Sequence, residues 1–201
     1  MMNRSAEEIA MREAVATWGR EKWPRARLVH ELVVTTSRID MAFIEPDNII
    51  GVEIKSSRDT LDRLTEQMRT FREHLPSVVL VIAPKWDNNN SYGADDVVCC
   101  DVASDVPIDA HMRFLSPRMT VTAPMLKLLW ASEARAIAAR HNLGSNPRLP
   151  LNTSIPRLAR KLIGDEIVRE VCRELRARDA FPKADGHPAS DPPIFVKPEL
   201  S

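Results

Sequence analysis

The segment at residues 38–57, RIDMAFIEPDNIIGVEIKSS, decides the fold class, because it holds two extended runs separated by a short polar break. Residues 38–45 and 49–56 are rich in Ile, Val and Phe, which favour β-strands, and the PDN sequence between them is typical of a turn. A third run of this kind, at residues 27–36, comes just before them. The three runs predict a meander of three strands.

Helical patterns flank the meander on both sides. The sequence SAEE at residues 5–8 matches a capping box, and the helix that it starts ends before Trp23, which a proline follows. Residues 58–75 carry apolar side chains at helical spacing. Residues 78–83 form an unbroken apolar strand, and a strand reached through a helical crossover is normally parallel to an earlier one. The predicted α/β order is helix, three-strand meander, crossover helix, strand.

The pattern becomes helical in the C-terminal half, after a further strand at residues 97–102. Three helices are predicted there, at residues 124–142, 155–162 and 165–178. From residue 181 onward the chain holds many prolines and little apolar periodicity, which predicts a disordered or loosely attached tail. The predicted organisation is a core of residues 1–117, a helical extension of residues 118–180 and a tail of residues 181–201.

Charge is distributed unevenly although the formal net charge of the chain is zero. Residues 1–117 hold 14 Lys and Arg against 19 Asp and Glu, whereas residues 118–178 hold 12 against 5. A net charge of zero argues against a protein that coats nucleic acid without specificity. The basic C-terminal region could pair with the acidic N-terminal part, or it could supply a phosphate-contacting surface.

Cysteine usage and hydropathy indicate the compartment. The three cysteines, Cys99, Cys100 and Cys172, form no C-x-x-C pair and fit neither a disulfide framework nor a zinc site. No window approaches the roughly 18 apolar residues that a membrane span requires. We therefore expect a soluble cytoplasmic protein with no membrane partner.

Three ionisable residues lie inside the apolar runs: Asp40 in one, and Glu53 and Lys55 in the next. Side chains alternate along a strand, so Asp40 is expected to share a face with Ala42 and Ile44. Buried charges are unfavourable unless they are paired or bound to a metal, so the trio indicates a site. The three converge only if Asp40 stands opposite Glu53 or Lys55, which an even-numbered connection or a bulge gives.

The trio suits the hydrolysis of a phosphodiester bond. Two carboxylates can hold Mg²⁺, which activates water, while an ammonium group positions that water or stabilises the developing negative charge. An ordinary cross-strand pair of Glu and Lys on a solvent-exposed face is the alternative.

The segment resembles the PD-(D/E)XK nuclease superfamily. Its first motif corresponds to Ile39-Asp40, with isoleucine in place of proline, and its second to Glu53-Ile54-Lys55. The resemblance implies a restriction-endonuclease-like core and a site for Mg²⁺ or Mn²⁺ that is held by Asp40, Glu53 and the Ile54 carbonyl. It also implies that Lys55 orients the nucleophile or stabilises charge.

Two further positions match the pattern of these nucleases. Glu31 corresponds to an acidic residue beside the metal, and Gln67 to a glutamine that faces the site from the crossover helix. Glu31 could instead form a salt bridge to Arg27 or Arg38. Over residues 28–178, the chain also looks like a group of small bacterial and phage proteins that are predicted to be such nucleases.

Candidate contacts to nucleic acid lie in two regions. Ser56, Ser57 and Arg58 follow the second motif at the expected mouth of the site, where they could contact a phosphate or cap the next helix, as Asp59 also could. The remaining candidates are basic residues: Arg38, Arg157, Arg160 and Lys161. Trp130 lies among leucines at helical spacing, which predicts a core residue.

The sequence thus predicts a Mg²⁺- or Mn²⁺-dependent nuclease that acts on nucleic acid, DNA before RNA, in repair, recombination or the biology of phages and mobile elements. The competing hypothesis is an inactive protein with the nuclease fold that binds nucleic acid or regulates. The sequence leaves open whether the protein is a monomer or a homodimer.

Overall fold

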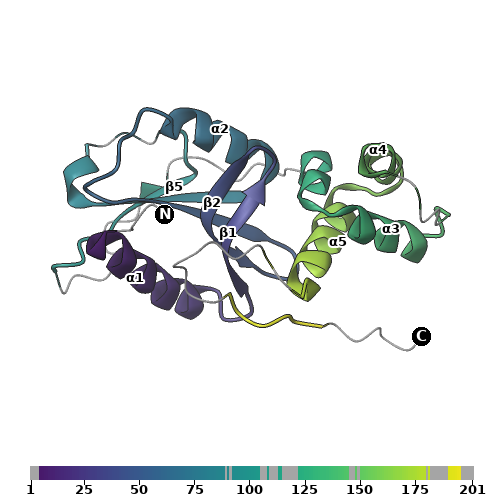
Figure 1. Ribbon diagram of the computed structural model, residues 1–201, viewed down its shortest axis with the longest axis horizontal. Helices are drawn as coiled ribbons and strands as arrows, with labels where there is room; N and C mark the ends of the chain where they lie inside the picture. Colours follow the sequence, from purple (N-terminus) through teal and green to yellow (C-terminus); the bar gives the residue numbers. More distant parts are fainter. Residues whose placement is uncertain are drawn as a thin grey trace.

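The computed structural model describes residues 5–88, 90, 92–104, 108, 113–114, 122–144, 148, 150–179, 181 and 190–195. It shows a mixed α/β fold around one sheet with strand order β1-β2-β3-β4-β5-β6 (Figure 1). The elements are α1 (Ala6–Lys22), β1 (Arg27–Val34), β2 (Ser37–Ile44), β3 (Ile49–Lys55), α2 (Leu64–His74), β4 (Ser77–Ile82), the 3₁₀ helix η1 (Pro84–Trp86), β5 (Asp96–Cys99), β6 (Arg113–Phe114), the 3₁₀ helix η2 (Ala123–Leu128), α3 (Ala131–Arg140), α4 (Leu151–Lys161) and α5 (Gly164–Ala177).

The element order of the N-terminal part is the predicted one. Strands β1, β2 and β3 form an antiparallel meander, and α2 leads from β3 to β4, which is parallel to β3. Strand β5 continues the parallel part and β6 pairs with β5 in the antiparallel sense. All six residues of β4 are buried, as expected for an apolar strand that is covered on both faces.

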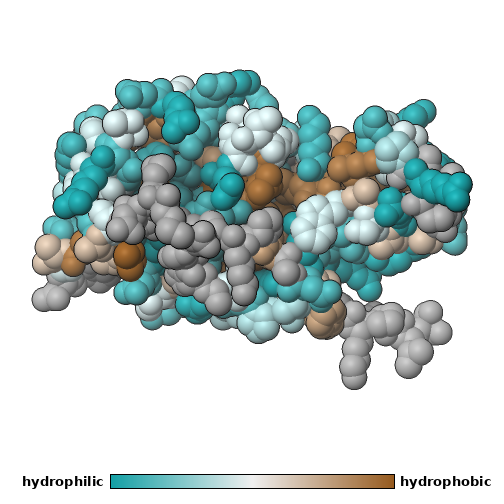
Figure 2. All heavy atoms as spheres, in the orientation of Figure 1, coloured by the Kyte–Doolittle hydropathy of each residue, from teal (hydrophilic) through white to brown (hydrophobic). Residues whose placement is uncertain are grey.

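Helices cover the sheet on both faces, and each face has its own apolar cluster. The α1-side cluster joins α1 to one face of the sheet through Met11, Val15, Trp18, Met41, Phe43, Val52 and Ile54, among others. The α2-side cluster lies on the other face and continues into η2, α3, α4 and α5. In Figure 2, hydrophobic residues gather where the C-terminal helices meet the sheet. The helical extension therefore shares a core with the sheet.

Gly19 determines how closely α1 approaches the sheet. A Cβ atom at this position would lie 2.0 Å from Cζ of Phe43, so only glycine fits there. Alanine normally stabilises a helix relative to glycine, by roughly 0.5–1 kcal/mol. We expect the clash to outweigh this gain, so that Gly19→Ala lowers the free energy of unfolding by about 1–3 kcal/mol in urea denaturation. Thr17→Ala, on the exposed face of α1, is the control; equal stability of the two variants would contradict the packing.

Helix α2 begins later than the periodicity predicts. It starts at Leu64, because the carboxylate of Asp59 accepts hydrogen bonds from the amide and hydroxyl of Ser56, each at 2.7 Å, and holds residues 56–59 in a turn. The expected cap by Ser57 or Asp59 is therefore wrong. Turn-forming Ser and Asp side chains compete here with the helical pattern that follows.

The helix predicted at residues 124–142 is interrupted. Trp130 is extended, with φ −78° and ψ 161°, and separates η2 from α3. The Glu133 carboxylate accepts from the Trp130 amide at 2.6 Å, as a helix cap does. The indole is 47% exposed, and the guanidinium of Arg178 lies 4.2 Å from its centre. The prediction that Trp130 is a core residue is wrong.

Part of the tail binds the outer edge of β1. The amide of Asp191 donates to the Leu28 carbonyl at 2.9 Å, and its carboxylate accepts from the Leu28 amide at 3.0 Å. Ser190 accepts from the His30 amide. Residues 190–195 thus cover an edge strand rather than hanging loose, and the rest of the predicted tail from residue 182 lies outside the described residues. Within the described part of the chain, no helix is long and apolar enough to cross a bilayer.

Candidate functional site

The pairing of β2 with β3 ends one residue short of Asp40 and Glu53. The ladder runs from Ile44 opposite Ile49 to Met41 opposite Val52, and the same register continued by one residue would set Asp40 against Glu53. The connection at residues 45–48 has an even number of residues and is closed by a hydrogen bond of 2.9 Å from the amide of residue 45 to the carbonyl of residue 48. An even-numbered connection is one of the two arrangements expected to let the three charged residues converge.

A local twist turns Asp40 away from the face on which simple alternation places it. Ile39 and Ala42, three residues apart, both join the α2-side cluster, so the alternation breaks between them. Glu31, beside this point on β1, has a φ of 56°, which is unusual for a residue other than glycine. The expectation that Asp40 shares a face with Ala42 and Ile44 is therefore wrong.

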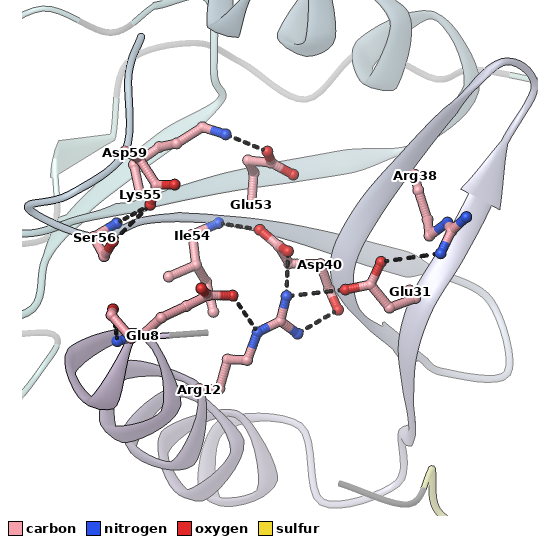
Figure 3. Close-up of polar contacts among 11 residues, drawn as sticks. Glu8, Arg12, Glu31, Arg38, Asp40, Glu53, Ile54, Lys55, Ser56 and Asp59 are labelled. Atoms are coloured by element: carbon pink, nitrogen blue, oxygen red, sulfur yellow. Dashed lines mark hydrogen bonds and ion pairs between the residues drawn. The ribbon is translucent and has the colours of Figure 1, made fainter. Parts of the chain in front are cut away.

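Asp40 instead fills the gap where β2 and β3 separate. Its Oδ2 accepts from the Ile54 amide at 2.8 Å, at a point where the ladder with β2 has ended. Figure 3 shows Glu53 and Lys55 on the side of β3 away from α1, Arg12 on the α1 side, and Asp40 between them. Asp40 is thus positioned between two groups of charged residues.

Glu53 and Lys55 form a largely buried pair. Nζ of Lys55 donates to Oε1 of Glu53 at 2.8 Å, and only 3% of the Glu53 side chain is exposed. The pKa of Glu53 is raised to about 8, first by burial and then by the negative charge of Asp40, while Lys55 and the backbone of Asp40 oppose the rise. Burial lowers the pKa of Lys55, but the carboxylates of Glu53, Asp40 and Asp59 together outweigh this effect, so the pKa of the ammonium rises above its ordinary value.

The second carboxylate oxygen of Glu53 is a buried acceptor. Oε2 is buried and has no hydrogen-bond partner among the residues that the structure describes. A buried carboxylate oxygen without a donor is costly. A cation bound at this point would compensate both this oxygen and the negative charge of Asp40.

Arg12 is a site residue that sequence reasoning missed. It is 2% exposed, and its guanidinium lies among three carboxylates. Nη2 binds Oδ1 of Asp40 and Oε1 of Glu31, the latter at 3.0 Å, Nη1 donates to the Asp40 carbonyl at 3.1 Å, and Nε donates to Glu8 at 3.4 Å. Its only signal in the sequence is the i, i+4 pair with Glu8, which is common on solvent-exposed helix faces.

Glu31 pairs with two arginines. Its carboxylate binds Arg12 and lies 3.7 Å from Nη1 of Arg38. The structural alternative, a salt bridge to Arg38, is therefore present. The alternative partner Arg27 lies elsewhere, because its guanidinium donates to carbonyls at the C-terminal end of α5.

The other candidates near the motif have mixed positions. Gln67 is half-buried on α2, and no contact in the described part of the chain joins its side chain to the carboxylates. Ser57 donates from its amide and hydroxyl to Glu7 of α1, which ties the end of β3 to the start of that helix. Ser56 is held by Asp59, so both hydroxyls are engaged, while Arg58 is exposed.

The basic residues of α4 lie away from this site. Arg157, Arg160 and Lys161 are exposed, and Arg157 donates to the Leu143 carbonyl at 2.6 Å. Helix α4 packs on α3 and η2 (Figure 1). Arg27, opposite Ile44 at the other end of β2 from Asp40, binds the end of α5, so the helices pack at the opposite end of the sheet from the charged site.

Asp40 and Glu53 are the side chains that could hold a hydrated divalent cation. No group of three or more His, Cys, Asp or Glu side chains suited to a metal occurs in the described residues. Mg²⁺, however, often binds through one or two carboxylates and keeps several waters. Asp40 and the unpartnered Oε2 of Glu53 supply two carboxylates. Glu31, which arginines engage, does not fit the metal shell proposed for it.

Comparisons with known proteins identify a family. No protein with a curated description matches the chain. A solved protein of unknown function from Silicibacter pomeroyi is similar at 18% sequence identity and a TM-score of 0.48, over 73% of this chain and 100% of that one. The family model described as bacteriophage P4 protein cII matches residues 1–173. The chain therefore belongs to the bacteriophage P4 cII protein family.

Proposed function

We propose that this protein is a metal-dependent nuclease with a PD-(D/E)XK core, which hydrolyses phosphodiester bonds in DNA. The observation that carries the proposal is the unpartnered, buried Oε2 of Glu53, which lies beside Asp40 and Lys55. The proposed core would comprise α1 to β4, whose order resembles that of restriction-endonuclease-like proteins. Membership in a phage protein family supports a role in the biology of phages or mobile elements. Recombination or repair is part of the proposal and would follow from the nuclease activity.

Each residue of the site has a distinct task in this mechanism. Asp40 and Glu53 would hold Mg²⁺ or Mn²⁺, and the Ile54 carbonyl remains a candidate third ligand. A bound divalent ion would polarise the scissile phosphate and lower the pKa of a nearby water. Lys55 keeps its proton, because its pKa is raised, so its ammonium can orient the attacking water or stabilise negative charge on the phosphate.

The surface beside Lys55 offers cationic contacts for a phosphate backbone. Lys85 of η1 is exposed and donates to the Ser57 carbonyl at 2.8 Å, so it lies next to the end of β3. Arg58 is exposed in the same turn. The basic residues of α4, at the opposite end of the sheet, are the alternative surface, whereas Arg38 pairs with Glu31 beside the site. Proximity to Glu53 and Lys55 favours the surface at Lys85 and Arg58.

Lys85→Ala is expected to weaken DNA binding two- to tenfold and to lower the slope of log affinity against log salt by about one, as the loss of one phosphate contact does. Arg160→Ala, a similar change on α4, is the control and should leave both quantities near wild type. Fluorescence anisotropy with EDTA present measures binding without cleavage. The reverse ranking of the two variants would assign binding to α4.

The nuclease assay itself is direct. Purified protein with Mn²⁺ or Mg²⁺ is expected to cut at least one of single-stranded, duplex, flapped or branched DNA, and EDTA should stop the cutting. Complete resistance of all four substrates would refute the proposal, provided that the protein is folded.

One arrangement favours a second candidate, an inactive protein of this fold that binds nucleic acid or regulates. Arg12 already pairs with Asp40, and the described residues hold no cluster of three metal-binding side chains. In that case Mn²⁺ should not bind, and salt-sensitive DNA binding should survive Asp40→Ala. Calorimetric titration with Mn²⁺ separates the two candidates.

A further inference from the structure

The guanidinium of Arg12 occupies the place of a cation in the candidate site. It is almost fully buried and touches carboxylates from three elements: Glu8 of α1, Glu31 of β1 and Asp40 of β2. Exposed ion pairs contribute little, but a buried arginine with several partners fixes their positions. Figure 3 shows the guanidinium among these three carboxylates, on the opposite side of Asp40 from Glu53.

Asp40 is consequently shared between two sides of the site. Oδ1 binds Arg12, and Oδ2 accepts from the Ile54 amide. Each carboxylate oxygen has a second lone pair, so Asp40 can still contribute one bond toward the Glu53 side. On the α1 side, the fixed positive charge of Arg12 would repel a divalent ion at close range, where little water screens the two charges.

We propose that the site takes one divalent ion, on the Glu53 side of Asp40, and that Arg12 is a positioning residue that replaces a second metal ion on the α1 side. This inference rests on the proposed function and adds to it the metal stoichiometry. Arg12 neutralises Asp40 and Glu31 and holds Asp40 at the gap between β2 and β3. It needs no contact with the substrate.

The chain offers a matched control for Arg12. Arg38 also pairs with Glu31, at 3.7 Å, but its side chain is 53% exposed, whereas that of Arg12 is 2% exposed. Arg12→Gln and Arg38→Gln therefore remove the same charge from the same carboxylate. Only the first leaves Asp40 without its counter-cation.

The test measures Mn²⁺ binding by isothermal titration calorimetry and thermal unfolding, without any assay of activity. Wild type and Arg38→Gln should bind one Mn²⁺ per chain. Arg12→Gln should unfold roughly 6–15 °C lower in EDTA, because three carboxylates lose their shared cation. It should also bind a second Mn²⁺ and gain more stability from it than either of the other proteins.

Arg12→Lys keeps the charge and is expected to fold and to bind one ion, so the inference stays testable even if Arg12→Gln does not fold. Two Mn²⁺ ions per wild-type chain would overturn the inference alone. Equal responses of Arg12→Gln and Arg38→Gln to Mn²⁺ would do the same. A wild-type chain that binds no Mn²⁺ would overturn the proposed function as well.

Discussion

Cleavage of DNA by Lys55→Ala and Asp40→Asn is expected to be at least roughly 100-fold slower than cleavage by the wild type, with up to about 10⁴-fold for Lys55→Ala. Asp40→Asn removes one of two carboxylates that would hold the metal, and Lys55→Ala removes the ammonium that is fixed by Glu53 at 2.8 Å. Single-turnover rates with saturating Mn²⁺ measure the chemical step separately from binding.

Two comparisons make this result specific. Lys161→Ala, which removes an exposed lysine from α4, should cut at the wild-type rate. Circular dichroism and thermal unfolding establish that both site variants remain folded. Cleavage by Lys55→Ala at more than half of the wild-type rate would contradict a catalytic role of Lys55. The same rate in Asp40→Asn as well would point to a contaminating nuclease.

Glu53→Gln is expected to change how stability depends on pH in the absence of metal. The pKa of Glu53 is raised in the folded protein from 4.5 to about 8, so the folded state binds more protons than the unfolded state between these values. Glu53 thus contributes stability that is complete below about pH 4.5 and is lost as pH rises through about 8. At ~1.4 kcal/mol per pKa unit, the loss amounts to several kcal/mol.

The variant lacks this titration, so its stability relative to wild type should rise from pH 5 to pH 9 in urea denaturation with EDTA. With Mn²⁺ at pH 8, the wild type should instead be more stable than Glu53→Gln. The metal needs the ionised carboxylate, which only the wild type has. Glu66→Gln, on the exposed surface of α2, is the control and should follow the wild type throughout. A pH profile of Glu53→Gln that is parallel to that of wild type would contradict the raised pKa.

The strands and their order could be predicted because the signals are local. Residues 27–56 are dense in β-forming side chains and contain a turn sequence, which together predict β1, β2 and β3. The apolar run at residues 78–83 predicts β4. Each signal can be recognised without reference to the rest of the chain. For the register of β2 and β3 the sequence supplied only a condition, an even-numbered connection or a bulge, and the four-residue connection meets that condition. These features depend on neighbouring residues only.

The features that were missed or wrongly predicted depend on contacts between distant parts of the chain. Arg12 reads as an ordinary helical arginine until β1 and β2 place Glu31 and Asp40 around it. The break in alternation at Asp40 lies beside Glu31, which has a positive φ. Glutamate rarely adopts this conformation, so the sequence does not indicate it. Trp130 lies outside the core, where its indole contacts the guanidinium of Arg178. Arg178 also binds Glu133 at 2.6 Å and is almost fifty residues away in the sequence.

The position of the basic C-terminal helices could not be predicted from the sequence for the same reason. Its charge suggested a phosphate-contacting surface, but composition does not say at which end of a sheet a group of helices will pack. Arg27 binds the last carbonyls of α5, which fixes the helices at the end of β2 away from Asp40. Lys85 of η1, which lies outside that basic region, instead donates to the carbonyl of Ser57, two residues after Lys55.

The central claim is that Asp40 and Glu53 bind a common divalent ion beside Lys55. Anomalous diffraction from a crystal that has been soaked in Mn²⁺ tests it directly. The account predicts one anomalous peak between Asp40 and Glu53, on the side of Asp40 away from Arg12, with Oε2 of Glu53 as a ligand. A fully soaked crystal that shows no peak at these two carboxylates, with Arg12 and Asp40 paired as before, would contradict it.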